Sequence, residues 1–398
     1  MKEFGLIIKL AISMAFIMLF GDWIPEEVQR AFFTISVLMK ETLVFCMPFI
    51  VFSFIFACLS AFQKRAPLLI LLILSLVVLS NFIFVQIGFF AGDIFLPALG
   101  YTPSSAVKII GSQLPSLEPF FTIPYPQLIS IDKALLLGTI LGLFGAFFGN
   151  EKLAQYGNSL KDAVQAGLTK IFIPLVPVYI IGFLLKIHHD DSLVEMFTGY
   201  GPMIVLIVVI QFMATLLFYI KVNLGNIKDI KTSLKNVFPS SIVALSTMSS
   251  MATLPLTLEA AEKNTKNMAV AQIMIPATVN IHHVGDSIAV PILIAVVLAM
   301  HGIPPMSYET FFVFSLYYMV AKFGVPSVPG GELIVLFPIL EGQYGFTDSM
   351  SGLLTTLYLL MDPFITTTNV LANGALAICM DKICGRMKAF QATEATLS

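Results

Sequence analysis

The chain has 398 residues, of which 57% are hydrophobic and only 12% are charged, whereas a soluble domain carries about 25% charged residues. Its mean hydropathy is +0.91, and it contains 35 Phe and 19 Met residues but a single Trp. Lys and Arg together number 22 against 24 Asp and Glu, a net charge of -2, so we expect no nucleic-acid partner. These values exclude a soluble globule and predict an all-α polytopic membrane protein embedded in the lipid bilayer.

Apolar windows long enough to cross a hydrocarbon core of about 30 Å fill the first half of the chain. They cover residues 5–22, 41–62, 66–92, 134–149, 163–187 and 199–220. The first window could be a signal peptide, but no convincing small-residue cleavage site precedes Asp22, which favours a retained anchor helix. With the N-terminus inside, most Lys and Arg residues fall on the inner side, so the positive-inside rule predicts cytoplasmic N- and C-termini.

After residue 235 the apolar pattern changes. Apolar stretches persist, but Ser, Thr, Gly, Pro and isolated charges interrupt them, as in residues 246–255 and 324–332. Non-helical backbone at membrane depth is tolerated only where protein or a water-filled cavity satisfies its polar groups. Transporters use such interrupted helices and hairpins to hold substrate and ions near the midplane. We therefore expect the first two-thirds to be scaffold and the last third to carry the site.

The last apolar segment carries a polar stripe. Asp362, Thr366, Asn369 and Asn373 recur at helical spacing and share one face. The stripe could be hydrogen-bonded glue between helices, but intramembrane carboxylates are expensive and functional by default. The presence of Asp362 therefore favours a face that contacts a ligand.

A second cluster of ionisable residues comprises His282, His283 and Asp286. Imidazole nitrogens suit transition metals such as Ni²⁺ or Zn²⁺, and Asp286 is spaced either as a third ligand or as a carboxylate that orients an imidazole. Adjacent histidines on a regular helix point about 100° apart, so both would reach one ion only from unwound backbone. The alternative is one hydrogen-bonded histidine and one proton relay.

Other features receive no functional assignment or a structural one. We interpret the loop at residues 93–130 as an outer connector and His188–Asp191 as a solvated turn. For Lys322, snorkelling to the outer interface is favoured over a buried counter-charge for Asp362 or Glu332. We predict buried apolar thiols, with no disulfide framework, for Cys46, Cys58, Cys379 and Cys384.

The order of these segments resembles the dicarboxylate/amino acid:cation symporters, the glutamate-transporter family. The run Ser249–Pro255 looks like the serine-rich tip of the family's first hairpin, and Val328–Gly331 looks like the second. The resemblance implies eight transmembrane helices plus two re-entrant helical hairpins, in a homotrimer whose transport domains move elevator-fashion against a fixed scaffold. No G-x-S-x-G or H-E-x-x-H motif supports catalysis, so we expect no enzyme activity.

The resemblance also implies a division of the chain. Residues 1–65 would form scaffold helices 1 and 2, and residues 66–131 transport-domain helix 3 with the outer loop. Residues 132–222 would form scaffold helices 4 and 5 with transport-domain helix 6. Residues 223–390 would form the transport-domain core, with the first hairpin, broken helix 7, the second hairpin and helix 8.

By the same resemblance, particular residues would hold the solutes. The substrate would contact both hairpin tips and the last helix, at Ser249, Ser250, Met251, Val328, Gly331, Asp362, Thr366 and Asn369. Coupling cations would be held by Thr278, Asn280, Asn369 and Asn373.

Departures from the family pattern concern both substrate and ions. Members that bind acidic substrates place an arginine where this chain has Ile365 or Met248, so a bidentate partner for a side-chain carboxylate is missing. In the family's Asn-Met-Asp-Gly-Thr motif the aspartate ligates sodium, whereas His282 stands at its place here. The sodium carboxylate of the last helix is replaced by Asn373. Both departures weaken the usual sodium sites.

These observations predict a prokaryotic inner-membrane symporter of a small, neutral amino acid or related solute. A transition metal at His282, His283 and Asp286, a proton on one of these residues, or residual sodium would couple transport. The alternatives are a sodium-coupled dicarboxylate or amino acid symporter, or a sensor or channel of the same fold.

Overall fold

The computed structural model describes most of the chain. The described residues are 16–17, 20–60, 67–103, 117–123, 125–126, 128–129, 131–149, 151–167, 170–171, 173–189, 193–251, 253–325 and 330–385. Within these residues the regular secondary structure is entirely helical, as the composition predicts. Most of the predicted first window, residues 5–22, lies outside the described part of the chain.

The described helices have the following bounds. In chain order they are η1 (Gly21–Trp23), α2 (Glu26–Ser60), α3 (Pro67–Phe95), α5 (Ile131–Phe148), α6 (Glu151–Gly167), α7 (Ile173–His189), α8 (Leu193–Val222), α9 (Ile227–Thr247), α10 (Leu254–Asn264), α11 (Met268–Thr278), α12 (Val284–Met300), α13 (Tyr308–Ala321), η4 (Lys322–Gly324), α14 (Gly331–Tyr344) and α15 (Asp348–Cys384).

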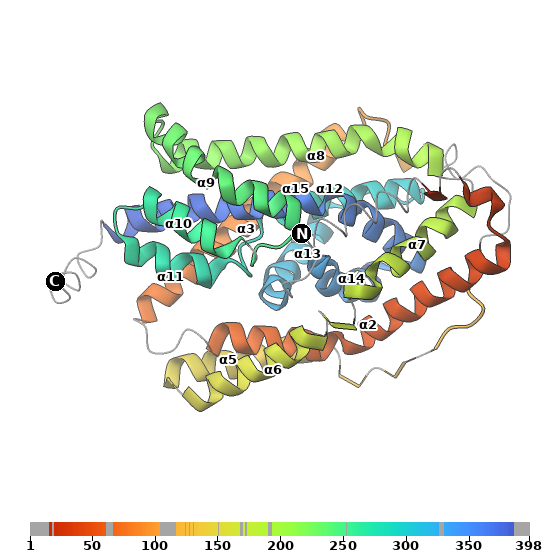
Figure 1. Ribbon diagram of the computed structural model, residues 1–398, viewed down its shortest axis with the longest axis horizontal. Helices are drawn as coiled ribbons and strands as arrows, with labels where there is room; N and C mark the ends of the chain where they lie inside the picture. Colours follow the sequence, from red (N-terminus) through yellow and green to blue (C-terminus); the bar gives the residue numbers. More distant parts are fainter. Residues whose placement is uncertain are drawn as a thin grey trace.

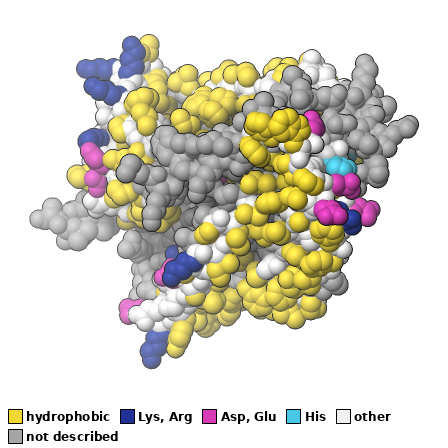
Figure 2. Space-filling view, turned by 45° about the vertical axis from the view of Figure 1, so that its right-hand side comes forward, with side chains coloured by type: hydrophobic (Ala, Val, Ile, Leu, Met, Phe, Trp, Pro, Cys, Tyr) yellow, Lys and Arg dark blue, Asp and Glu magenta, His cyan; other side chains and the backbone are white. Residues whose placement is uncertain are grey.

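Among the described residues, three helices are long and apolar enough to cross a membrane. They are Leu71–Phe95, Tyr200–Val222 and Asp348–Cys384. Large apolar side chains, such as Leu79 of α3 and Leu217 of α8, remain exposed on these helices, as expected of a surface that meets lipid. Figure 2 shows apolar side chains covering much of one face, with most of the Lys and Arg side chains near its edge.

One predicted window can be compared with the structure only in part. Within residues 163–187, α6 extends to Gly167 and α7 begins at Ile173. Residues 168, 169 and 172 lie outside the described part of the chain.

The helices fall into two groups (Figure 1). In the first group, α2 packs along α5, α6 and α7. In the second, α12 packs against α3, α8 and α15, and α15 also contacts α9, α10 and α11. Figure 1 shows α8 along one long edge and α2 towards the opposite one, with α12 to α15 between them.

Helix α12 lies at the centre of the second group. All of its residues except Ala295 are buried. An α-helix that is apolar on every side requires neighbours around its whole circumference, and α3, α8 and α15 supply them. The first turn of α12 therefore places its side chains in the interior, away from lipid.

Three breaks between helices lie in this group. Residues 248–251 and 253 lie between α9 and α10, residues 279–283 separate α11 from α12, and Val325 and Gly330 are described between η4 and α14. Met248 ends α9 with a φ of 50°, a left-handed conformation that is uncommon outside glycine and turns the chain sharply. The helix break at Asn280 agrees with the broken helix 7 that the family resemblance implies.

Several minor predictions can also be compared with the structure. His188 and His189 end α7, and His188 Nε2 lies 3.0 Å from Asp22 Oδ1, while Asp190 and Asp191 lie outside the described residues. The thiols of Cys46, Cys379 and Cys384 are free, but only Cys384 is buried, whereas Cys46 and Cys379 are partly exposed. The side chain of Cys58 lies outside the described part of the chain.

The contact of α12 with α15 leaves no room for a side chain at residue 285. A Cβ atom on Gly285 would lie 2.2 Å from the carbonyl oxygen of Ile365. We predict that Gly285→Ala forces the two helices apart and lowers stability by about 1–3 kcal/mol or more, seen as a lower Tm in detergent. Gly342→Ala is the control, because a Cβ there meets nothing within 4 Å. Equal Tm values for the two variants would contradict the packing.

Candidate functional site

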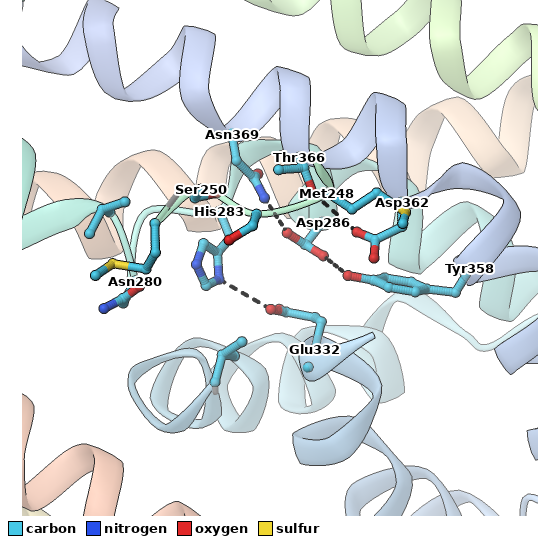
Figure 3. Close-up of a pocket in the computed structure, with 15 residues that line it drawn as sticks. Met248, Ser250, Asn280, His283, Asp286, Glu332, Tyr358, Asp362, Thr366 and Asn369 are labelled. Atoms are coloured by element: carbon cyan, nitrogen blue, oxygen red, sulfur yellow. Dashed lines mark hydrogen bonds and ion pairs between the residues drawn. The ribbon is translucent and has the colours of Figure 1, made fainter. Parts of the chain in front are cut away.

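A polar pocket lies where these three breaks meet α12, α14 and α15 (Figure 3). Its walls therefore come from six parts of the chain. The lining residues are Met248, Ser249, Ser250, Met251, Val279, Asn280, His283, Asp286, Val325, Gly331, Glu332, Tyr358, Asp362, Thr366 and Asn369.

The predicted substrate residues largely converge on this pocket. Ser249, Ser250 and Met251 line it from the α9–α10 link, and Gly331 lines it from the start of α14. Asp362, Thr366 and Asn369 line it from one face of α15. Val328 lies outside the described residues.

Asp362 is held from two sides. Its Oδ1 accepts a hydrogen bond from the Thr366 hydroxyl at 3.1 Å, and its Oδ2 accepts one from the Gly330 N–H at 3.2 Å. The carboxylate therefore links α15 to the segment that precedes α14. Because Asp362 also lines the pocket, it has the position expected of a group that receives a cationic part of a ligand.

Asn369 combines the two roles that the sequence left open for the polar stripe. Its Oδ1 accepts from the Gly285 N–H at 2.7 Å, and its Nδ2 donates to Asp286 Oδ2 at 2.7 Å. These bonds join α15 to α12, as interhelical glue would. Asn369 nevertheless faces the pocket, so the stripe both ties helices together and lines a cavity.

The two adjacent histidines point to different partners. His282 is fully buried, with Nδ1 3.2 Å from Asn373 Oδ1 and Nε2 2.9 Å from the Ser80 hydroxyl. His283 faces the pocket, and its Nδ1 lies 3.1 Å from Glu332 Oε2. The unwound backbone therefore separates the two imidazoles instead of directing both to one point.

The predicted cation residues divide in the same way. Asn280 lines the pocket, whereas Asn373 contacts His282. Thr278 ends α11, and its side chain donates to the Met274 carbonyl at 2.8 Å. Its own carbonyl accepts the N–H groups of the following unwound residues, Ile281 and His282.

A different triad gathers potential metal ligands. One ligand atom each from His283, Asp286 and Glu332 lies within 4.8 Å of the others, the one such group of His, Cys, Asp and Glu in the described residues. His282 is not part of it. Asp286 accepts hydrogen bonds from the Tyr358 hydroxyl and from Asn369 (Figure 3).

The prediction for Lys322 is wrong. It does not snorkel to the outer interface, since its side chain is fully buried and its Nζ lies 2.7 Å from Glu332 Oε1. The counter-charge interpretation, with Glu332 as partner, describes the structure. A window of sequence around Lys322 suggested a helix end near water, whereas the folded segment turns inward.

Sequence reasoning missed Tyr358 and the amide side chains around the helix break. Tyr358 lies four residues before Asp362, so the helical spacing of the stripe could have included it. Asn81 of α3 donates to the Ile281 carbonyl at 2.7 Å and accepts from the His283 N–H at 3.1 Å. No local pattern connects these residues, because they are 200 positions apart.

The charge of the pocket has one sign. Asp286, Glu332 and Asp362 line it, while none of its lining residues is Lys or Arg. The three arginines of the chain are Arg30, Arg65 and Arg386. Arg30 lies elsewhere, donating to the main-chain carbonyl of Glu118. The pocket therefore favours a ligand with a positively charged group.

The helix break generates a prediction about Asn81. Replacing it with Leu leaves the buried Ile281 carbonyl and His283 N–H without their partner, so we expect a loss of about 2 kcal/mol or more in stability. Gln86→Leu on the same helix is the control, because no described residue hydrogen-bonds the buried Gln86 amide. Thermal unfolding in detergent compares them, and a smaller effect at Asn81 than at Gln86 would refute the proposed role.

The sequence is similar to a known protein family and to several bacterial proteins. The family model described as the Sodium:dicarboxylate symporter family matches residues 6–383. An uncharacterized symporter of Haemophilus influenzae is 26% identical over 311 residues, which are 73% of this chain and 68% of that protein. The serine/threonine transporter SstT of Acinetobacter baumannii is 22% identical over 341 residues, covering 82% of this chain and 83% of the relative.

A third relative carries another substrate in its name. The proton/sodium-glutamate symport protein of Bacillus caldotenax is 25% identical over 326 residues, covering 75% of this chain and 74% of that protein. The family match extends over nearly the whole chain and includes every element that lines the pocket. The chain therefore belongs to the sodium:dicarboxylate symporter family.

Proposed function

We propose that this protein is a secondary active symporter of a small, neutral amino acid in a bacterial inner membrane, coupled to protons or sodium ions. The observation that carries the proposal is Asp362, a carboxylate in a pocket whose lining residues include no arginine. Its hydrogen bonds to Gly330 and Thr366 fix the carboxylate in place while it remains part of the pocket wall.

The pocket suits the ammonium and carboxylate groups that all amino acids share, and it disfavours acidic side chains. The Asp362 carboxylate would accept the substrate ammonium group, and the α9–α10 link, with Ser249 and Ser250, would receive the substrate carboxylate. A second carboxylate would approach Asp286 and Glu332 without a cationic partner in the lining, which is unfavourable in a buried site. The name of the serine/threonine relative is consistent with such a substrate.

Protons can be carried at His282 without disrupting its surroundings. The Asn373 oxygen accepts from Nδ1, and the Ser80 hydroxyl can donate to Nε2 of a neutral imidazole. The same hydroxyl can turn and accept from a protonated Nε2. His282 would therefore gain a proton and keep both hydrogen bonds, so we favour proton coupling over residual sodium coupling through Thr278, Asn280, Asn369 and Asn373.

Metal coupling is a second candidate, favoured by the triad of His283, Asp286 and Glu332. The ligand set differs from the predicted one, since Glu332 takes the place of His282. Lys322 already pairs with Glu332, so a divalent ion such as Ni²⁺ or Zn²⁺ would have to bind beside an ammonium group. This repulsion makes metal coupling the weaker candidate.

The packing supports a scaffold and a transport domain. Helices α2, α5, α6 and α7 would form the scaffold, and α3 with α8 to α15 would form the moving domain. The domain boundaries at residues 65, 131 and 222 are part of this proposal. We propose the family arrangement for this chain, with eight spans, two re-entrant hairpins built from α9–α10 and α13–α14, cytoplasmic termini, a homotrimer and elevator movement. A sensor of the same fold would bind substrate without transporting it. A channel of the same fold would conduct solute at a rate that does not saturate.

The substrate proposal predicts a ligand-dependent gain in stability. Serine, threonine, alanine and related neutral amino acids should raise the Tm of the purified protein more than glutamate, aspartate or succinate, because a ligand that binds the folded state stabilises it. Asp362→Asn should weaken binding about 30-fold or more, equivalent to about 2 kcal/mol, by removing the charged acceptor. Asp229→Asn, at an exposed position of α9, is the control. Preferential stabilisation by acidic ligands would reject the proposal.

The coupling proposal predicts uptake driven by an inward acid gradient in sodium-free proteoliposomes. His282→Asp combined with Asn373→Asp should convert this to stimulation by sodium, because carboxylates repay the dehydration of Na⁺ better than imidazole and amide groups. Uptake of the substrate identified by thermal shift provides the measurement.

Two further conditions complete this test. A chelator should leave uptake unchanged, and loss of uptake that Ni²⁺ or Zn²⁺ restores would replace proton coupling with metal coupling. Equal uptake with and without the acid gradient would remove proton coupling. Saturable counterflow separates a transporter from a channel, and tight binding without flux identifies a sensor.

A further inference from the structure

Lys322 is the most unusual charged residue of the described structure. It opens η4, directly after α13, and its side chain has 0% exposure. Lysine is almost never fully buried unless it is paired, because removing an ammonium group from water is expensive. What surrounds the ammonium group therefore indicates why it is there.

Three groups of different chemistry surround this ammonium group. The Glu332 carboxylate lies 2.7 Å from Nζ, and the main-chain carbonyl oxygen of His283 lies 3.4 Å from it. The ring centroid of Tyr318 lies 4.2 Å from Nζ. A carboxylate, a carbonyl freed by a helix break and an aromatic face are the groups that bind a monovalent cation in a buried site.

The three groups come from three different parts of the fold. Tyr318 belongs to α13, Glu332 to the first turn of α14, and His283 to the break before α12. Glu332 also receives a contact from the His283 imidazole at 3.1 Å. A cation at this point therefore connects the α13–α14 hairpin to the interrupted helix beside the pocket.

We propose that the Lys322 ammonium group is the resident, covalently tethered ion of a buried monovalent-cation site formed by Glu332, the His283 carbonyl and Tyr318. The protein supplies the cation, so this point in the structure needs no ion from solution. The connection between hairpin and helix break is then present whether sodium is available or not.

Charge explains why the tethered ion is monovalent. The adjoining Asp286 carboxylate receives its hydrogen bonds from Tyr358 and Asn369, which are neutral, and Glu332 is left to Lys322 and His283. One ammonium group thus matches one carboxylate. The inference goes beyond the proposed function, because it concerns a cation site and is independent of which substrate is carried.

An ordinary structural ion pair would have the same geometry, so the test must separate the two. Lys322→Ala removes the ammonium group and the side chain that fills the path to it, leaving space beside Glu332. Lys322→Met removes the charge but retains a chain of similar length. Only a true cation site should recover when a small cation is added to the alanine variant.

The experiment measures Tm of the purified protein without substrate, in series of ammonium, methylammonium, sodium and potassium chloride. Choline chloride keeps the ionic strength constant. We expect both variants to have a lower Tm than the parent protein. Ammonium or methylammonium should restore at least half of the loss in Lys322→Ala, with saturation, and none in Lys322→Met. The parent protein should not respond beyond the choline series.

A second variant tests whether the added cation binds beside Glu332. Lys322→Ala combined with Glu332→Gln should lose the response to cations, because the carboxylate that attracts them is gone. Equal responses of the alanine and methionine variants would overturn the proposal, as would a rescue that survives Glu332→Gln. If Lys322→Ala cannot be purified even in ammonium while Lys322→Met can, the proposal also fails. Since no substrate is used, failure leaves the proposed transport function standing.

Discussion

The site depends on one constraint, that backbone freed from a helix inside an apolar environment must find other partners. Residues 279–283 interrupt the path from α11 to α12, and amide side chains from neighbouring helices satisfy the exposed groups. The side chain of Asn81 on α3 donates a hydrogen bond to the Ile281 carbonyl and accepts one from the His283 N–H. Gln211 of α8 donates to the Gly285 carbonyl at 2.9 Å, and Asn369 of α15 accepts from the Gly285 N–H.

These bonds fix more than the break itself. Because α3, α8 and α15 all anchor the first turn of α12, His283 and Asp286 have defined positions relative to the polar face of α15. The close approach at Gly285, which the absence of a side chain permits, brings the α12 backbone against Ile365. The pocket therefore results from the way in which neighbouring helices hydrogen-bond the main-chain groups that the helix break leaves free.

The distribution of charge follows from the same arrangement. Asp286 and Glu332 lie in the first turns of α12 and α14, where the positive ends of helix dipoles favour carboxylates. Asp362 lies inside α15 and receives no such help, although Gly330 and Thr366 donate to it. Asp362 is thus the carboxylate with the strongest need for a cation from outside, which is why we propose it as the place for a substrate ammonium group.

The sequence predicts this site where local spacing carries the information and misses it where distant segments meet. The stripe from Asp362 to Asn373 could be recognised because helical periodicity is local, and three of its four members line the pocket. The interruption near Asn280 was visible as polar residues between apolar runs. Lys322 was misinterpreted because its burial depends on Glu332 and on His283, which is 39 positions away. Ser80 and Asn81 carried no signal, since only packing brings α3 to the break.

The departures from the family pattern also share one direction. By resemblance, His282 and Asn373 stand where other members have aspartates that bind sodium, so two anionic ligands are replaced by neutral groups that bond to each other at 3.2 Å. Lys322 adds an internal cation to a carboxylate that would otherwise attract one. Each change reduces the number of carboxylates that need a cation from solution. In a chain that retained the aspartates and also buried Lys322, the ammonium group would compete with sodium for the same carboxylates. In this chain Asp362 remains in the pocket wall without a cationic partner among the lining residues, which is the position that we propose for a substrate ammonium group.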